Sequence, residues 1–130
     1  MGKKVTQANI IKNKYGQHYL IELIHCDGEK LKFVPAVKKV LLQAAKKSKA
    51  KLLKSYFHQF RPFGVSGVLF IKESHFSIHT WPEDNYAGVD IQTCGFMYPQ
   101  RAIEELKNKF YAQKVKVRIF RRGELIELRE

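Results

Sequence analysis

The chain has 130 residues, of which 45% are hydrophobic and 28% charged, a composition typical of one globular domain. Its two cysteines, Cys26 and Cys94, are too few for a disulfide framework and lack the paired spacing of a zinc knuckle. No stretch has the apolar length of a signal peptide or a membrane span, so we expect a cytoplasmic protein without a membrane partner.

The formal net charge is +12, and the positive charge is unevenly distributed. Residues 30–61 contain ten Lys or Arg and no acid, whereas residues 62–100 contain only Lys72 and four acids. A basic surface can bind nucleic acid, but nucleic-acid sites usually combine the charge with aromatic or Arg side chains. The helix predicted to begin near Pro35 carries only lysines as its basic residues, which favours a solvent-exposed helix face, so nucleic acid is not the expected partner.

Five segments have the alternating or β-branched apolar pattern of strands, and they are residues 18–26, 51–60, 65–73, 86–93 and 115–120. Residues 74–81 continue the third segment with little break, so a separate strand there requires a kink or bulge near Glu73. Apolar residues spaced by three and four predict two helices, which begin near Pro35 and Pro99.

The predicted order is therefore β-α-β-β-β-α-β within a single domain of residues 1–130. This order is typical of an α+β two-layer sandwich, in which a mainly antiparallel sheet has both helices on one face. The second face of such a sheet also needs a cover. The simplest way to bury this face is to pack it against a second copy of the chain, so we expect a homodimer.

Residues 73–95 contain several reactive side chains whose roles remain open from spacing alone. His75 and His79 would lie roughly 13 Å apart along a strand, too far to share one zinc ion, so no metal site is expected. The GxSxG turn of a serine hydrolase is missing. Cys94, which precedes Gly95, fits either a small buried side chain or a reactive thiol.

Three motifs together are more specific than any single residue. The chain reads GQHYLIELIHCD near its start, then FHQFRPFGVSGV, then ESHFSIHTWPEDNYAGVDIQTCG. Over about residues 16–126 it resembles the bacterial and archaeal S-adenosylmethionine decarboxylases, small pyruvoyl enzymes made as proenzymes. The resemblance implies decarboxylation of S-adenosylmethionine, which yields the aminopropyl donor for spermidine synthesis.

The resemblance also implies that the chain cleaves itself between Glu73 and Ser74. Ser74 would attack the Glu73 carbonyl to form an ester, and β-elimination would then yield a β chain of residues 1–73 and an α chain of residues 74–130. Residue 74 would become a pyruvoyl group, whose ketone forms a Schiff base with the substrate amine and takes up electrons.

Roles for single residues follow from the same resemblance. Ser74 is the pyruvoyl precursor, and His79 is the proton acceptor in processing. Cys94 is the proton donor in catalysis, and Ser66 assists processing. Strict strand alternation places Ser74 and His79 on opposite faces, so these roles require a bend or a change of strand between them.

The resemblance places Phe60, Trp81 and Glu83 in the substrate pocket. Aromatic rings can flank an adenine, and a carboxylate can accept hydrogen bonds from ribose or attract a cation. Residues 73–95 contain no Lys or Arg, which suits a positively charged sulfonium substrate.

Three positions depart from the usual pattern of these decarboxylases, namely Arg61, Phe63 and Phe96. They leave open a pyruvoyl-dependent arginine or ornithine decarboxylase on the same fold. A non-catalytic basic binding module is a further alternative, and the intact Ser74, His79 and Cys94 argue against it.

Overall fold

A six-stranded antiparallel sheet and two α-helices form the part of the chain that the computed structural model describes, residues 15–123. The strands are β1 (Gln17–Ile24), β2 (Leu52–Gln59), β3 (Val65–Ile71), β4 (Ser74–Trp81), β5 (Tyr86–Thr93) and β6 (Lys114–Arg121). The helices are α2 (Val34–Lys47) and α3 (Pro99–Lys109), and the short 3-10 helices are η2 (Gly28–Leu31) and η3 (Pro82–Asp84).

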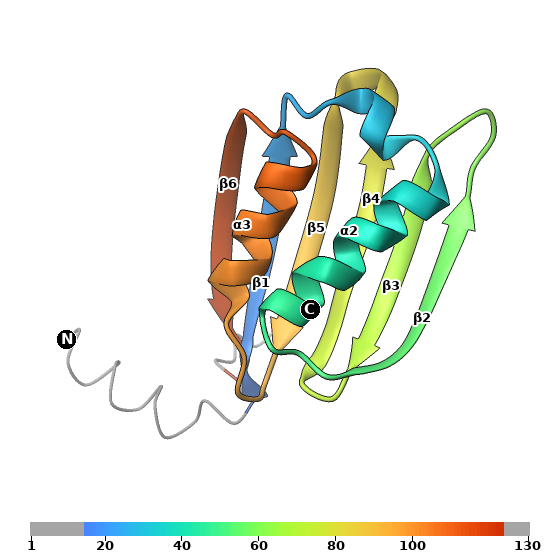
Figure 1. Cartoon of the computed structure of the whole chain (residues 1–130). Helices are drawn as coiled ribbons and strands as arrows, with labels where there is room; N and C mark the ends of the chain where they lie inside the picture. The colour runs from blue at the N-terminus through green and yellow to red at the C-terminus, as the bar shows by residue number, and fades with distance from the viewer. Residues whose placement is uncertain (1–14, 124–130) are drawn as a thin grey trace, which may run out of the picture.

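The strands lie in the order β2-β3-β4-β5-β1-β6, and every neighbouring pair is antiparallel. Strands β2 to β5 follow one another along the chain, whereas β1 lies between β5 and β6. Both helices cover the same face of the sheet, where they pack against each other (Figure 1).

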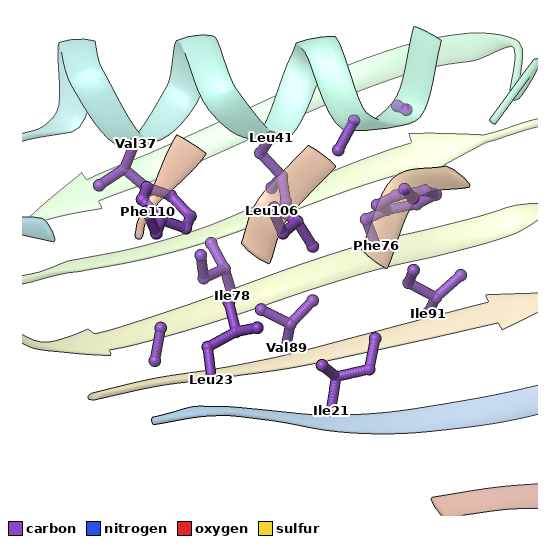
Figure 2. Close-up of a cluster of buried hydrophobic side chains, with 14 of the residues drawn as sticks. Ile21, Leu23, Val37, Leu41, Phe76, Ile78, Val89, Ile91, Leu106 and Phe110 are labelled. Carbon is purple, nitrogen blue, oxygen red and sulfur yellow. The ribbon is translucent and has the colours of Figure 1, made fainter. Parts of the chain in front are cut away.

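The core fills the space between this face and the helices (Figure 2). Alternate residues of β4 and β5 point into it, and Phe76, Ile78 and Ile91 have no exposed surface. The four-residue spacing of Val37 and Leu41 brings two fully buried α2 side chains onto the same layer. Each such side chain stabilises the fold by about 1.5–3 kcal/mol relative to an exposed one.

The opposite face, which we call the open face, has no helix on it among residues 15–123. Strand register places several large, substantially exposed apolar side chains there, namely Leu20, Tyr56, Phe70, Trp81 and Phe120. The prediction that a second copy covers this face remains a prediction. None of the helices among these residues is long and apolar enough to cross a membrane.

The predicted α+β two-layer sandwich is confirmed, but the predicted order lacks one strand. Residues 74–81 form β4 rather than an extension of β3, so the observed order is β-α-β-β-β-β-α-β. The chain reverses at Lys72 and Glu73, which are the only residues between the two strands. The one-domain prediction for residues 1–130 extends beyond the described residues at both ends.

Candidate active site

The turn between β3 and β4 holds the peptide bond that the sequence analysis singles out. Ser74, the first residue of β4, has a φ of 151°, a backbone conformation that residues with a side chain rarely adopt. Such a conformation costs on the order of 1–3 kcal/mol and persists only where surrounding contacts enforce it. The Glu73–Ser74 bond therefore lies at a strained position.

Two hydrogen bonds from Cys94 hold the carbonyl oxygen of Glu73. The backbone N–H of Cys94 donates to this oxygen at 2.8 Å, and the thiol donates to it at 3.0 Å. Paired donors on a carbonyl oxygen polarise the carbonyl and stabilise negative charge that develops on it. The arrangement therefore favours attack of a nucleophile on the Glu73 carbonyl carbon.

The side chain of Glu73 is also fixed in position, by burial, a hydrogen bond and close packing. It is 9% exposed, and its Oε1 accepts a hydrogen bond of 3.2 Å from the backbone N–H of Lys51. Gly95 lies so close that a Cβ there would be 2.6 Å from the Glu73 Cγ. The contacts of Lys51 and Gly95 with Glu73 cannot be predicted from the sequence, because they depend on how distant segments pack around the turn.

A cavity of about 290 Å³ opens beside this turn. Cys94, Gly95 and Thr93 line one side of it, and Gln17 and Tyr19 of β1 line another. Small-molecule sites typically have about 300–1,000 Å³, so this cavity has room for part of a small ligand next to the thiol. We call Glu73, Ser74 and Cys94 the turn group.

Ser66 and His79 form a second cluster at the other end of the sheet. They face each other on β3 and β4, and the Ser66 Oγ and the His79 Nδ1 share a hydrogen bond of 2.7 Å. The Trp81 ring lies 6.3 Å from that of His79 and 5.5 Å from that of Tyr86, between ring centroids. The structure thus brings together two residues that were each expected to take part in processing, a contact that was not predicted.

The remaining predicted pocket residues lie at this same end. Phe60 directly follows β2, its side chain is 47% exposed, and its ring packs against that of His58. Glu83 lies in η3 and lines a separate cavity of about 290 Å³ together with Phe63. We call Ser66, His79, Phe60, Trp81 and Glu83 the far-end group.

Within one chain the turn group and the far-end group are well separated. His79 is five residues from Ser74 along β4, which corresponds to roughly 17 Å at the usual rise of a strand. Figure 1 shows that the β3–β4 turn and the end of β4 lie at opposite ends of the strands. β4 does not bend to bring the two residues together, so one chain does not assemble all the predicted residues.

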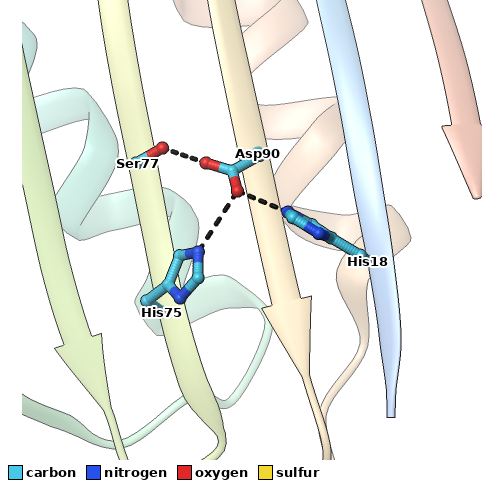
Figure 3. A network of polar contacts seen from close by, with 4 residues as sticks. All are labelled: His18, His75, Ser77 and Asp90. Atoms are coloured by element: carbon cyan, nitrogen blue, oxygen red, sulfur yellow. Dashed lines mark hydrogen bonds and ion pairs between the residues drawn. The ribbon is translucent and has the colours of Figure 1, made fainter. Parts of the chain in front are cut away.

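A polar network on the open face was not predicted. Asp90 of β5 accepts a hydrogen bond from Ser77 and contacts His75 on β4 and His18 on β1 (Figure 3). Burial alone raises the pKa of Asp90, but its hydrogen bonds with Ser77, His18 and His75 outweigh burial, so the pKa lies below its usual value.

A family model described as S-adenosylmethionine decarboxylase matches residues 17–123, most of the chain. The chain belongs to the S-adenosylmethionine decarboxylase family. The matched range includes the turn group, the far-end group and all the strands and helices named above for residues 15–123.

Curated members of the family from both bacteria and archaea are similar to the chain. The S-adenosylmethionine decarboxylase proenzyme of Thermotoga petrophila is 44% identical over 114 residues, which cover 87% of this chain and 88% of that protein. The proenzyme of Thermococcus onnurineus is 43% identical over 109 residues, covering 83% and 77%. Both are described as proenzymes, that is, as precursors.

A solved structure of the family has the same fold. The crystal structure of the adenosylmethionine decarboxylase from Aquifex aeolicus matches with a TM-score of 0.77 and 32% sequence identity. The match covers 89% of this chain and 97% of that chain. Sequence and fold therefore lead to the same family.

Proposed function

We propose that the chain decarboxylates S-adenosylmethionine after cleaving itself between Glu73 and Ser74. One observation carries the proposal: the Glu73–Ser74 bond lies in a strained turn, and both Cys94 donors hold its carbonyl oxygen. A family of proenzymes provides the context in which such a turn is a cleavage site. The product would be the aminopropyl donor for spermidine synthesis.

Processing begins at the Ser74 hydroxyl. Its oxygen attacks the Glu73 carbonyl carbon, the carbon–nitrogen bond breaks, and the nitrogen takes the hydroxyl proton, which leaves an ester. The Cys94 N–H and S–H groups, at 2.8 and 3.0 Å from the carbonyl oxygen, stabilise the negative charge that forms on it. The constrained Glu73 side chain keeps the carbonyl in place.

The ester is then cleaved by elimination. A base removes the α-proton of residue 74, the bond between its Cβ and the ester oxygen breaks, and Glu73 leaves as a carboxylate. Water converts the resulting dehydroalanine into a pyruvoyl group and ammonia. His79 suits the role of base because a neutral imidazole has a nitrogen that can accept a proton, and the 2.7 Å hydrogen bond with Ser66 orients its ring.

His79 lies too far from Ser74 to act within the same chain, and this distance supports a homodimer. A twofold axis that runs across the strands and parallel to the sheet would place the far-end group of one copy against the turn group of the other. The exposed apolar side chains of the open face, such as Phe70 and Tyr56, would then be buried between the two sheets.

For decarboxylation, a pyruvoyl group supplies an electron sink for the electrons that the lost carboxylate leaves behind. The turn fits the formation of that group, because the hydroxyl and the polarised carbonyl belong to adjacent residues. Cys94, which lines the cavity at the turn, is placed to donate a proton to the product carbon. Phe60 and Trp81, each almost half exposed, offer ring faces to an adenine, and Glu83 offers a carboxylate.

The experiment combines mass spectrometry with a carbon dioxide assay. Denaturing mass spectrometry of the purified protein should show chains of 73 and 57 residues, the second blocked by a pyruvoyl group. Ser74→Ala should remain a folded, uncut chain without activity, whereas Ser55→Ala on β2 should be cut normally. A wild-type chain that stays full-length after long incubation contradicts self-cleavage.

Release of labelled carbon dioxide decides the substrate. We expect release from carboxyl-labelled S-adenosylmethionine and none from arginine or ornithine, because the curated relatives are S-adenosylmethionine decarboxylases. Preferential release from arginine or ornithine would contradict the proposed substrate but not the cleavage. We place the reaction in the cytoplasm, which cell fractionation tests.

A further inference from the structure

Two histidines and one aspartate from three neighbouring strands converge on the open face (Figure 3). The Asp90 Oδ2 lies 2.5 Å from the His18 Nε2 and 3.1 Å from the His75 Nε2. One potential ligand atom of each residue lies within 4.8 Å of those of the other two. Three metal-ligating side chains therefore present their donor atoms to one small region.

The register of the sheet places these side chains. His18 on β1 and His75 on β4 both lie opposite Gln92 of β5, one on each side of it. Asp90 lies two residues from Gln92 and therefore projects from the same face between the two rings. The ring centroids are 6.0 Å apart and the planes are nearly perpendicular, at 86°. Backbone pairing thus positions all three groups without a flexible loop.

We propose that His18, His75 and Asp90 bind one divalent transition-metal ion, with Zn²⁺ as the probe. Two imidazole nitrogens and one carboxylate oxygen suit zinc, cobalt or nickel, whereas magnesium and calcium prefer oxygen ligands alone. Tetrahedral bonds of about 2.0–2.1 Å require donor atoms roughly 3.3 Å apart. The 3.1 Å between the Asp90 Oδ2 and the His75 Nε2 is close to this. The 2.5 Å between the Asp90 Oδ2 and the His18 Nε2 must lengthen, and the two histidine nitrogens, which lie within 4.8 Å, must reach the same spacing, so metal binding requires the histidine rings to shift.

The surroundings of Asp90 complete the site. Ser77 donates a hydrogen bond to the Asp90 Oδ1, which orients the carboxylate and leaves Oδ2 directed at the histidines. Hydrogen bonds of this kind to a ligating carboxylate typically change metal affinity by 10–100-fold. In the single chain the side chains of His18, His75 and Asp90 are 23%, 31% and 21% exposed. In the proposed homodimer the open faces of the two copies cover them, so the ion would bind between the two sheets.

The test uses the full chain without a histidine tag, stripped with a chelator and titrated with Zn²⁺ in a calorimeter. We expect one ion per chain and no binding of Mg²⁺. Ser77→Ala should weaken Zn²⁺ binding by about tenfold or more, and His18→Ala and Asp90→Ala, which each remove a ligand, should weaken it further. His25→Asn is the matched control, because His25 is exposed at the end of β1 and Asn tolerates its positive φ of 56°.

Two measurements on the wild-type protein keep the test independent of how the variants fold. Co²⁺ should give the visible absorption of a four-coordinate ion, and Zn²⁺ should shift the NMR signals of His18 and His75 but not those of His25. Lack of saturable Zn²⁺ binding overturns the proposal, as does equal weakening in His25→Asn. The Ser74→Ala protein should bind Zn²⁺ equally well, so the outcome does not depend on self-cleavage.

Discussion

Tyr86 illustrates how a single pair of side chains makes stability depend on pH. Its hydroxyl donates to the Glu22 Oε1 at 2.6 Å across the open face. Burial, the hydrogen bond and the charge of Glu22 together raise the pKa of Tyr86 to about 12, from a usual value of 10.0. Because the folded state favours the neutral phenol, this pair stabilises the protein fully below pH 10 and progressively less as the pH rises towards 12.

We predict that Tyr86→Phe lowers the free energy of unfolding at pH 8 but has a smaller effect at pH 11. Urea unfolding at both pH values measures the difference between wild type and variant. Tyr56→Phe is the control, because Tyr56 is 69% exposed and should change stability little at either pH. An effect of Tyr86→Phe that is equal or larger at pH 11 would contradict the assigned role of Glu22.

Sequence alone singles out the residues of the turn group because they lie in one continuous motif, but it does not indicate the Asp90 network. His18 and Asp90 are far apart in the chain, and they meet only because β1 pairs with β5 in one particular register. His75 and His79 lie too far apart on one strand to share a metal ion, so their spacing in the sequence predicts no metal site.

At the scale of secondary structure, helices were easier to predict than strand boundaries. The three- and four-residue spacing that places Val37 and Leu41 in the core is unambiguous, and α2 begins beside Pro35 as expected. The β3–β4 turn was not identified as a full reversal because Lys72 and Glu73 are not typical turn residues. The buried positions change from odd-numbered residues in β3 to even-numbered residues in β4, and this shift in the alternation was not recognised as a reversal.

A glycine in the loop between β5 and α3 packs against this turn. Gly95 follows β5, and a Cβ there would lie 2.6 Å from the Glu73 Cγ. We predict that Gly95→Ala displaces Glu73, weakens its carbonyl contacts with Cys94 and slows self-cleavage at least tenfold, since loss of one such donor typically costs 10²–10³ in rate. Gel electrophoresis of newly translated protein over time measures the rate.

Glu104→Ala provides the control for this prediction, because Glu104 is exposed on α3 and should leave the rate unchanged. The melting temperature of each variant separates slow cleavage from poor folding. Cleavage of Gly95→Ala at the wild-type rate would show that the Glu73 position is not critical for the reaction.

At the scale of the whole molecule, the sheet separates residues that the proposed mechanism requires together. Ser74 and Cys94 lie at one end of the strands, and Ser66 and His79 lie at the other end. Motif analysis finds both sets because each is local in the sequence. It does not show whether they meet within a chain or between chains, because that depends on the length and straightness of β4.

We predict that processing uses His79 of one copy and Ser74 of another. His79→Ala alone should remain uncut. Co-expression with Ser74→Ala, whose His79 is intact, should lead to cleavage of the His79→Ala chain, because a mixed dimer contains one complete set of residues. With equal expression and random pairing, about half of the dimers are mixed, so up to half of the His79→Ala chains should be cut.

Distinct purification tags on the two chains, followed by mass spectrometry, identify which chain is cleaved. The matched control is a helper chain that carries both Ser74→Ala and His79→Ala, which should rescue nothing because neither copy then has His79. Ser66→Ala in place of His79→Ala should behave in the same way, since its hydroxyl contacts the His79 ring. Cleavage that is never rescued in mixed dimers would mean that His79 acts within its own chain, which requires β4 to rearrange.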